Sequence, residues 1–176
     1  MDMGVYPLHV LTGLLGPVQR VTAMTGHVLQ DFIVPDGPHE GKVVPVEEDD
    51  NWHMLLDFGG SRIAGVAAQG CIQDTRVPQV EIHGLKGTIA LNILDVAAPV
   101  ELFRTGIGWQ QIKLPQTGRL SGPDHLLGIE HLIDSIQNST KPVLDADHAL
   151  HVIEIIEKAA QSALEGTTLK VTSTFS

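Results

Sequence analysis

The stretch "NWHMLLDFGGSRIAGVAAQG", residues 51–70, decides the fold that we expect for this chain. Apolar and polar side chains alternate over residues 51–58, which is typical of a half-buried β-strand. Gly59 and Gly60 then supply turn residues, and a second apolar segment follows directly. The sequence therefore predicts an antiparallel β-hairpin over residues 51–70.

The second strand of this hairpin is built from unusually small residues: Ala64, Gly65, Ala67, Ala68 and Gly70. Small residues in a strand allow another backbone to approach closely. A helix of the same chain and a partner chain are both suitable neighbours, and the sequence does not choose between them.

Further strands are predicted on both sides of the hairpin. Alternating or β-branched patterns mark residues 18–29, 78–91, 100–105, 109–115 and 168–175. The acidic, Pro- and Gly-rich residues 31–50 predict a long, solvated loop with an edge strand near 42–46. Because most of these segments follow one another through short turns, we expect a mainly antiparallel sheet.

Three helices are predicted. Leu residues at helical spacing mark residues 8–15, which Gly16 and Pro17 terminate. A possible capping box at Ser121–Asp124 precedes an apolar stripe formed by Leu126, Ile129, Leu132, Ile133 and Ile136. Asp145 caps a third helix that ends at Gly166, with an inward face expected to consist of Leu150, Ile153, Ile156, Ala160 and Ala163.

This order of elements predicts an α+β fold, a mainly antiparallel open sheet with helices packed on one face. The other face would then expose apolar side chains, because 43% of the residues are hydrophobic. Exposed apolar faces usually mark interfaces. We therefore expect a homodimer formed through the sheet.

Composition bounds the class of protein. The 176 residues suit one domain, and 11 basic against 21 acidic residues give a net charge of −10. That charge disfavours nucleic acid and anionic membrane surfaces as partners. The single cysteine, Cys71, excludes an intrachain disulfide, and the chain shows neither a secretion signal nor an apolar run long enough to span a membrane. A cytoplasmic location is expected.

The first nine residues have the composition of a site, because they place Asp2, Tyr6 and His9 at the start of a helix. Asp2 and Tyr6 are four residues apart and would share a helix face, although Pro7 allows the helix to begin only near itself. The helix dipole at this end favours negative charge, which suits a phenol that exchanges protons. A capping Asp and a half-buried Tyr without any chemistry remain the alternative.

A metal site can also be drawn on paper from His148 and His151 with Asp145 and Asp147. Acidic residues in the first turn of a helix are favourable without a metal. A closed site also needs three or four converging ligands, so we assign no metal.

Four stretches together resemble the C-terminal domain of the Gfo/Idh/MocA oxidoreductases, and they occur in that family's order: residues 2–23, 49–70, 81–91 and 128–166. The resemblance implies a two-domain enzyme in which a Rossmann domain binds NAD or NADP. In such enzymes an α+β domain mediates dimers through its sheet, and the substrate lies between the two domains. Residues 1–176 would be this substrate-binding and dimerisation domain, with the nucleotide-binding domain absent.

The resemblance also implies roles for the opening residues. The family's motif places an Asp four residues before a His or Tyr that acts as acid or base on the substrate hydroxyl; here these are Asp2 and Tyr6. The Tyr version is similar to the glucose-fructose oxidoreductase and dihydrodiol dehydrogenase branches. His9 lies where family members often place a substrate contact. The implied substrate is a sugar or a related hydroxyl or carbonyl compound.

Two departures from the family pattern limit what this chain is expected to do alone. The nearest match to G-x-G-x-x-G is "TGIGWQQ" at residues 105–111, which lacks the third glycine and has strand-like flanks. Lys141-Pro142 lies between two predicted helices and does not replace the family's catalytic Lys. We therefore expect this fragment to bind no dinucleotide and to be inactive by itself. The alternative function is a non-catalytic oligomerising or ligand-binding scaffold.

Overall fold

The computed structural model describes residues 4–95, 97–112 and 126–176, and it confirms the α+β fold with antiparallel strands. Two compact units make up the chain. Unit 1 comprises Met1–Gln73 together with Leu144–Ser176, and unit 2 comprises Asp74–Val143.

The main sheet of unit 1 has four antiparallel strands in the order β10-β1-β4-β5. They span Leu169–Lys170 (β10), Arg20–Gly26 (β1), Asn51–Asp57 (β4) and Ile63–Gln69 (β5). The predicted hairpin is confirmed, with Asn51 opposite Gln69 and Asp57 opposite Ile63. Its turn requires glycine, because Gly59 and Gly60 both have positive φ angles (77° and 58°).

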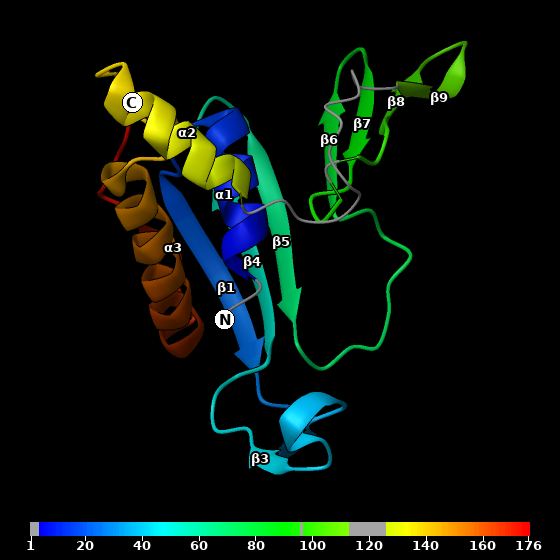
Figure 1. Cartoon of the computed structure of the whole chain (residues 1–176), viewed down its shortest axis with the longest axis vertical. Helices are drawn as coiled ribbons and strands as arrows, with labels where there is room; N and C mark the ends of the chain where they lie inside the picture. The colour runs from blue at the N-terminus through cyan, green and yellow to red at the C-terminus, as the bar shows by residue number, and fades with distance from the viewer. Residues whose placement is uncertain (1–3, 96, 113–125) are drawn as a thin grey trace. The chain divides into compact units, whose positions relative to one another are not determined.

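Helices α1 (Val5–Leu15) and α3 (Ala146–Glu165) cover one face of this sheet (Figure 1). The register places Val21 opposite Leu56 and Met54 opposite Val66, and all four side chains are buried beneath the helices. Leu8 of α1 and Ile155 of α3 are fully buried. The core of unit 1 therefore lies between this sheet face and the two helices.

The prediction of the inward face of α3 is wrong: the buried face is rotated about the helix axis by about a third of a turn from the predicted one. Leu150 and Ile153 are 59% and 51% exposed. The buried residues of the helix are His148, His151, Val152, Ile155, Ala159 and Ser162. Polar residues occupy the inward positions because each of them finds a hydrogen-bond partner in the core, so their burial is not penalised.

The opposite face of the sheet carries exposed apolar side chains, as predicted. Met24, Leu55 and Ile63 are 80%, 56% and 70% exposed. Gly65 lies opposite Leu55 and Ala67 lies opposite His53, so these two small residues share the same face. We refer to this surface of β1, β4 and β5 as the open face.

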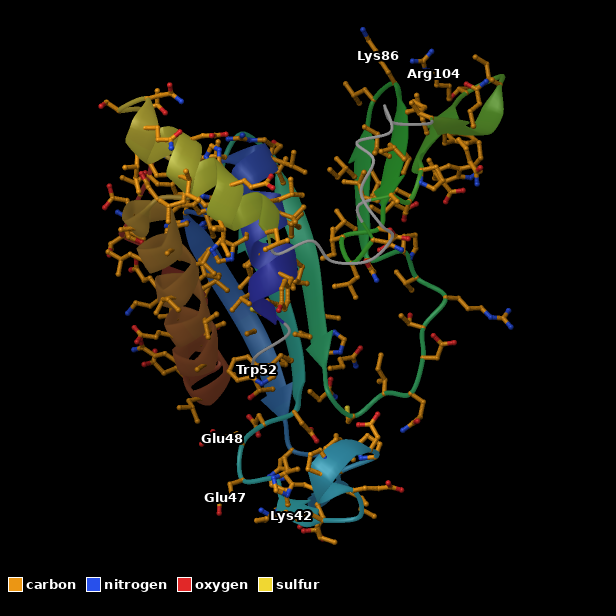
Figure 2. The ribbon with its side chains drawn as sticks, in the orientation of Figure 1. Lys42, Glu47, Glu48, Trp52, Lys86 and Arg104 are labelled. Carbon is orange, nitrogen blue, oxygen red and sulfur yellow. The ribbon has the colours of Figure 1, made fainter. Side chains whose placement is uncertain are left out.

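Between β1 and β4 the chain forms a two-stranded ribbon of β2 (Asp31–Ile33) and β3 (Val43–Pro45), with a 3₁₀ turn at Gly37–His39. The predicted edge strand near 42–46 is β3, and its partner β2 was not predicted. All residues of both strands are exposed. Figure 2 shows Lys42 on this ribbon and Glu47 and Glu48 on the loop that leads to Trp52 in β4, which confirms the solvated acidic loop.

The described residues of unit 2 form an antiparallel meander and one helix. The strands are β6 (Val80–Gly84), β7 (Gly87–Leu91), β8 (Val100–Arg104) and β9 (Gly108–Ile112), paired in chain order as a sheet separate from that of unit 1. Helix α2 spans Leu126–Gln137, and all five residues of its predicted apolar stripe are exposed. The proposed capping box at 121–124 lies outside the described residues.

The predicted final strand is shorter than expected. β10 ends at Lys170, and residues 171–175 are not in a strand, although the sequence predicted one over 168–175. Side chains of α3 hydrogen-bond this segment instead. We call residues 171–175 the C-terminal segment.

None of the helices formed by the described residues combines the length and the apolar character needed to cross a bilayer.

Candidate functional site

The candidate site begins at the amino end of α1. The helix starts at Val5, immediately after Gly4, and Pro7 occupies the first turn, where proline is tolerated. Tyr6 therefore lies in the first turn, as predicted, and is 42% exposed. Asp2, its predicted partner, lies outside the described residues.

His9 lies one turn after Tyr6 and is half-buried. Its Nδ1 is 2.9 Å from the carbonyl oxygen of Val5. A carbonyl only accepts hydrogen bonds, so Nδ1 carries the proton and Nε2 is the basic nitrogen of the neutral ring. Tyr6 and His9 are three residues apart on one helix, which makes them neighbours on its surface. The structure thus brings together two of the three predicted site residues.

Behind His9 lies a buried hydrogen-bonded pair that the sequence analysis did not identify as part of a site. Thr12 of α1 donates its hydroxyl proton to the carbonyl oxygen of Leu8 at 2.7 Å. Its Oγ1 also lies 2.7 Å from Nε2 of His148 on α3. The hydroxyl has a single proton, so both contacts are satisfied only when Nε2 of His148 is protonated and donates to Oγ1.

Two aromatic contacts enclose the ring of His148. The ring of Phe175 stacks on it with centroids 3.9 Å apart and planes 4° apart. The ring of His9 lies at 5.4 Å, tilted by 43°. Burial, followed by the nearby His9 and His151, holds the pKa of His148 below its ordinary value. His148 is therefore an uncharged ring that connects α1 to the C-terminal segment.

His151, one turn further along α3, has the opposite tautomer. Its Nε2 accepts a hydrogen bond from the backbone N–H of Val18 at 2.9 Å. Its Nδ1 lies 3.0 Å from the carbonyl oxygen of Ser173 and must donate to it. Burial lowers the pKa of His151 and outweighs the Ser173 hydrogen bond and the nearby Glu154, which would raise it.

These contacts argue against the metal site drawn from the sequence. Both nitrogens of His151 are used within the protein, and Nε2 of His148 donates to Thr12. Among the residues that the structure describes, no group of three or more His, Cys, Asp or Glu side chains is arranged to hold a metal ion.

Glu154 fixes the C-terminal segment to α3. Its Oε1 accepts from the backbone N–H and the hydroxyl of Thr172 at 2.9 and 2.7 Å, and its Oε2 accepts from the N–H of Ser173 at 2.6 Å. Burial alone would raise the pKa of Glu154, but the hydrogen bonds from Ser173 and Thr172 outweigh it and lower the pKa to about 2. The carboxylate is thus charged at neutral pH and serves a structural role.

Residues 105–111, the nearest match to a dinucleotide-binding motif, do not form a dinucleotide-binding turn. "TGIGWQQ" forms the turn between β8 and β9 and continues into β9, with positive φ angles at Gly106 (83°) and Gly108 (89°). A phosphate-binding turn would have to lead from a strand into the amino end of a helix. Lys141-Pro142 lies in the connection between α2 and α3, as the sequence indicated.

Comparisons with known proteins agree with the fold described above. The family model described as "Oxidoreductase family, C-terminal alpha/beta domain" matches residues 1–171. No curated protein sequence matches the chain. Solved structures are similar in fold and differ widely in sequence.

An oxidoreductase from Agrobacterium radiobacter, in complex with NAD+, L-tartaric acid and magnesium, is 21% identical, with a TM-score of 0.70 over 97% of this chain and 48% of its own. Aldose-aldose oxidoreductase from Caulobacter crescentus, complexed with glycerol, is 20% identical, with a TM-score of 0.66 over 95% and 45%. Levoglucosan dehydrogenase in complex with NADH is 14% identical, with a TM-score of 0.74 over 98% and 50%. The chain thus spans about half the length of these proteins.

Proposed function

This chain belongs to the Gfo/Idh/MocA oxidoreductase family as its C-terminal domain, and from that premise we propose that it is the substrate-binding and dimerisation half of an NAD(P)-dependent oxidoreductase. The proposed substrate is a sugar or a related hydroxyl or carbonyl compound. Its support is that two proteins of similar fold are named for sugar chemistry, levoglucosan dehydrogenase and aldose-aldose oxidoreductase.

The observation that carries the proposal is the exposed phenol of Tyr6 at the amino end of a helix whose other side is buried in the core. A phenol in this position is free to give a proton to a substrate oxygen or to take one from it. We assign the role of acid or base to Tyr6 and the role of orienting it to Asp2. His9, with Nε2 as its basic nitrogen, would accept a hydrogen bond from a substrate hydroxyl.

The test of this role is Tyr6→Phe in the complete enzyme, because phenylalanine keeps the ring and removes only the hydroxyl. We expect turnover to fall roughly 10²- to 10⁴-fold, the usual contribution of a general acid or base. Cofactor affinity should be retained. Leu14→Ala, an exposed change at the other end of α1, serves as the control and should leave turnover unaltered. Unchanged turnover in Tyr6→Phe would remove Tyr6 from the mechanism.

We assign binding of NAD or NADP to a separate nucleotide-binding domain, in accordance with the poor fit of residues 105–111. The chain of 176 residues should accordingly release no measurable heat of binding when it is titrated with NADH or NADPH. Saturable binding of either dinucleotide to this chain would contradict the assignment.

We further propose that the open face forms a homodimer interface with a second copy of the chain. Three large apolar side chains are exposed there, and Gly65 and Ala67 leave room for a partner to approach the backbone of β5. Leu55→Glu would bury unpaired carboxylates at such an interface, so it should convert the dimer into monomers in sedimentation analysis. Leu150→Glu, an equally exposed position on α3, is the matched control. Dissociation by the control alone would place the interface elsewhere.

A further inference from the structure

The amino end of α1 is not fixed by a side-chain cap at Gly4, and no acidic residue lies in its first turn. The hydrogen bond from α3 reaches α1 two turns later, at Thr12, which is fully buried. Rotation of α1 about its axis is therefore resisted by a contact that lies behind the exposed residues Tyr6 and His9.

A continuous chain of contacts leads from this point to the C-terminal segment. Thr12 is bonded to His148 at 2.7 Å, and His148 stacks on Phe175 at 3.9 Å. The backbone two residues before Phe175 is fixed in turn, since His151 binds the Ser173 carbonyl and Glu154 binds the Ser173 N–H. His148 thus has rigid neighbours on both sides and is 1% exposed.

The packing also reaches His9 directly. The rings of His9 and His148 lie 5.4 Å apart at 43°, within the range of a tilted aromatic contact. Among the hydrogen bonds that the described residues show, the ring of His9 makes one, from Nδ1 to the carbonyl oxygen of Val5. His148 therefore supplies the surface against which the His9 ring rests.

We propose that His148 is a positioning residue: clamped by Phe175, it fixes Thr12 and the His9 ring and so sets how α1 presents Tyr6 and His9 to the substrate. This inference rests on the proposed function for its consequence. The structural part of the inference is that His148 of α3 sets the positions of the Tyr6 and His9 rings on α1, and this part can be tested without measuring activity. His148 touches no reacting atom and is not itself catalytic.

NMR of the full chain can measure the protonation of the histidine rings and the proximity of the histidine and tyrosine rings to one another. Long-range ¹H–¹⁵N spectra report which nitrogen of each ring is protonated, and nuclear Overhauser effects report ring proximity. In the unaltered chain we expect the proton on Nε2 of His148 and on Nδ1 of His151, together with a cross-peak between the His9 and His148 rings.

Three variants separate positioning from general stability. Thr12→Val removes the hydroxyl at nearly constant shape and should abolish the His9–His148 cross-peak and shift the ring signals of Tyr6. Thr12→Ser restores a hydroxyl and should restore both. Ser162→Ala removes a fully buried hydroxyl on α3, which accepts a hydrogen bond from the N–H of Ala23, and should leave the α1 rings unaltered.

Phe175→Leu provides a second perturbation that leaves the hydrogen bond intact. It should weaken the His9–His148 cross-peak, because the stack that holds His148 is lost. The inference is overturned if Tyr6 and His9 signals are the same in Thr12→Val as in the unaltered chain, if Ser162→Ala moves them equally, or if His148 carries its proton on Nδ1. None of these outcomes depends on turnover, so failure here is distinct from a failure of Tyr6→Phe.

Discussion

Replacing Glu154 by Gln tests how firmly the C-terminal segment is attached to α3. The carboxylate accepts three hydrogen bonds from Thr172 and Ser173, at distances of 2.6 to 2.9 Å. Gln keeps the shape and one acceptor oxygen, so the two contacts of Thr172 survive. Its amide NH₂ replaces Oε2 and faces the N–H of Ser173, which places two donors against each other.

The magnitude follows from the pKa of Glu154, which is lowered from 4.5 to about 2. At full strength such a shift corresponds to about 3 kcal/mol of stability. Glu154 is only half-buried, and solvent screening reduces the figure to roughly 1 to 2 kcal/mol. Because the pKa is lowered on folding, this stability is present above pH 4.5 and is lost as the pH falls toward 2.

Urea unfolding followed by circular dichroism measures this cost at pH 7 and at pH 3.5. We expect Glu154→Gln to lower the free energy of unfolding at pH 7 and to differ less from the unaltered protein at pH 3.5. Glu157→Gln, an exposed position on the same helix, is the control and should change little. A cost that is equal at both pH values would refute the argument, because it would not come from the charge.

Two further predictions concern the core of unit 1. Burial lowers the pKa of His151, so the stability that the neutral ring contributes is complete above about pH 6.5 and is lost as the pH falls through the pKa of His151 in the folded protein. The urea midpoint should therefore be lower at pH 5.5 than at pH 7.5. A higher midpoint at pH 5.5 would contradict the neutral tautomer. Ile155→Ala should lower the free energy of unfolding by about 3 kcal/mol, because Ile155 is fully buried. Ile153→Ala, two positions away and half exposed, should lower it by less than about 1 kcal/mol in the same measurement. Equal costs would show that the helix is rotated from the orientation described.

The elements that the sequence predicted correctly are those with local signals. The hairpin of β4 and β5 is defined by the alternating apolar residues Trp52, Met54, Leu56 and Phe58 and by a Gly59-Gly60 turn. Helices α1 and α3 end where Gly16 and Gly166 adopt positive φ angles. Such signals involve residues within a few positions of one another, so they are readable without tertiary contacts.

The orientation of α3 was not predictable in this way. Leu150 and Ile153 form an apolar stripe that competes with the real inward face, and only distant partners make the polar face the buried one. Thr12, which bonds His148, is separated from it by 136 positions. Burial of a histidine is acceptable only once such a partner is present, and no local pattern reveals that.

The part of the candidate site that has a local signal in the sequence was predictable, and the part formed by distant segments was not. Tyr6 and His9 were identified from the order of residues at the start of a helix, and their placement follows from the helix itself. Thr12, His148 and Phe175 were missed as a group, because three segments distant in sequence meet to form it. A polar residue at a position where the apolar face of α1 would continue, as Thr12 is, was the one available signal.

The composition of unit 1 from Met1–Gln73 and Leu144–Ser176 has a consequence for biosynthesis. When Gln73 leaves the ribosome, β1, β4 and β5 already exist as sequence, but the helix that covers β1 has yet to be translated. At ordinary translation rates of about 5 to 20 residues per second, the hydrophobic side of these strands waits several seconds for α3. The nascent chain should therefore recruit chaperones during that interval, and this core should be completed only after α3 has been translated.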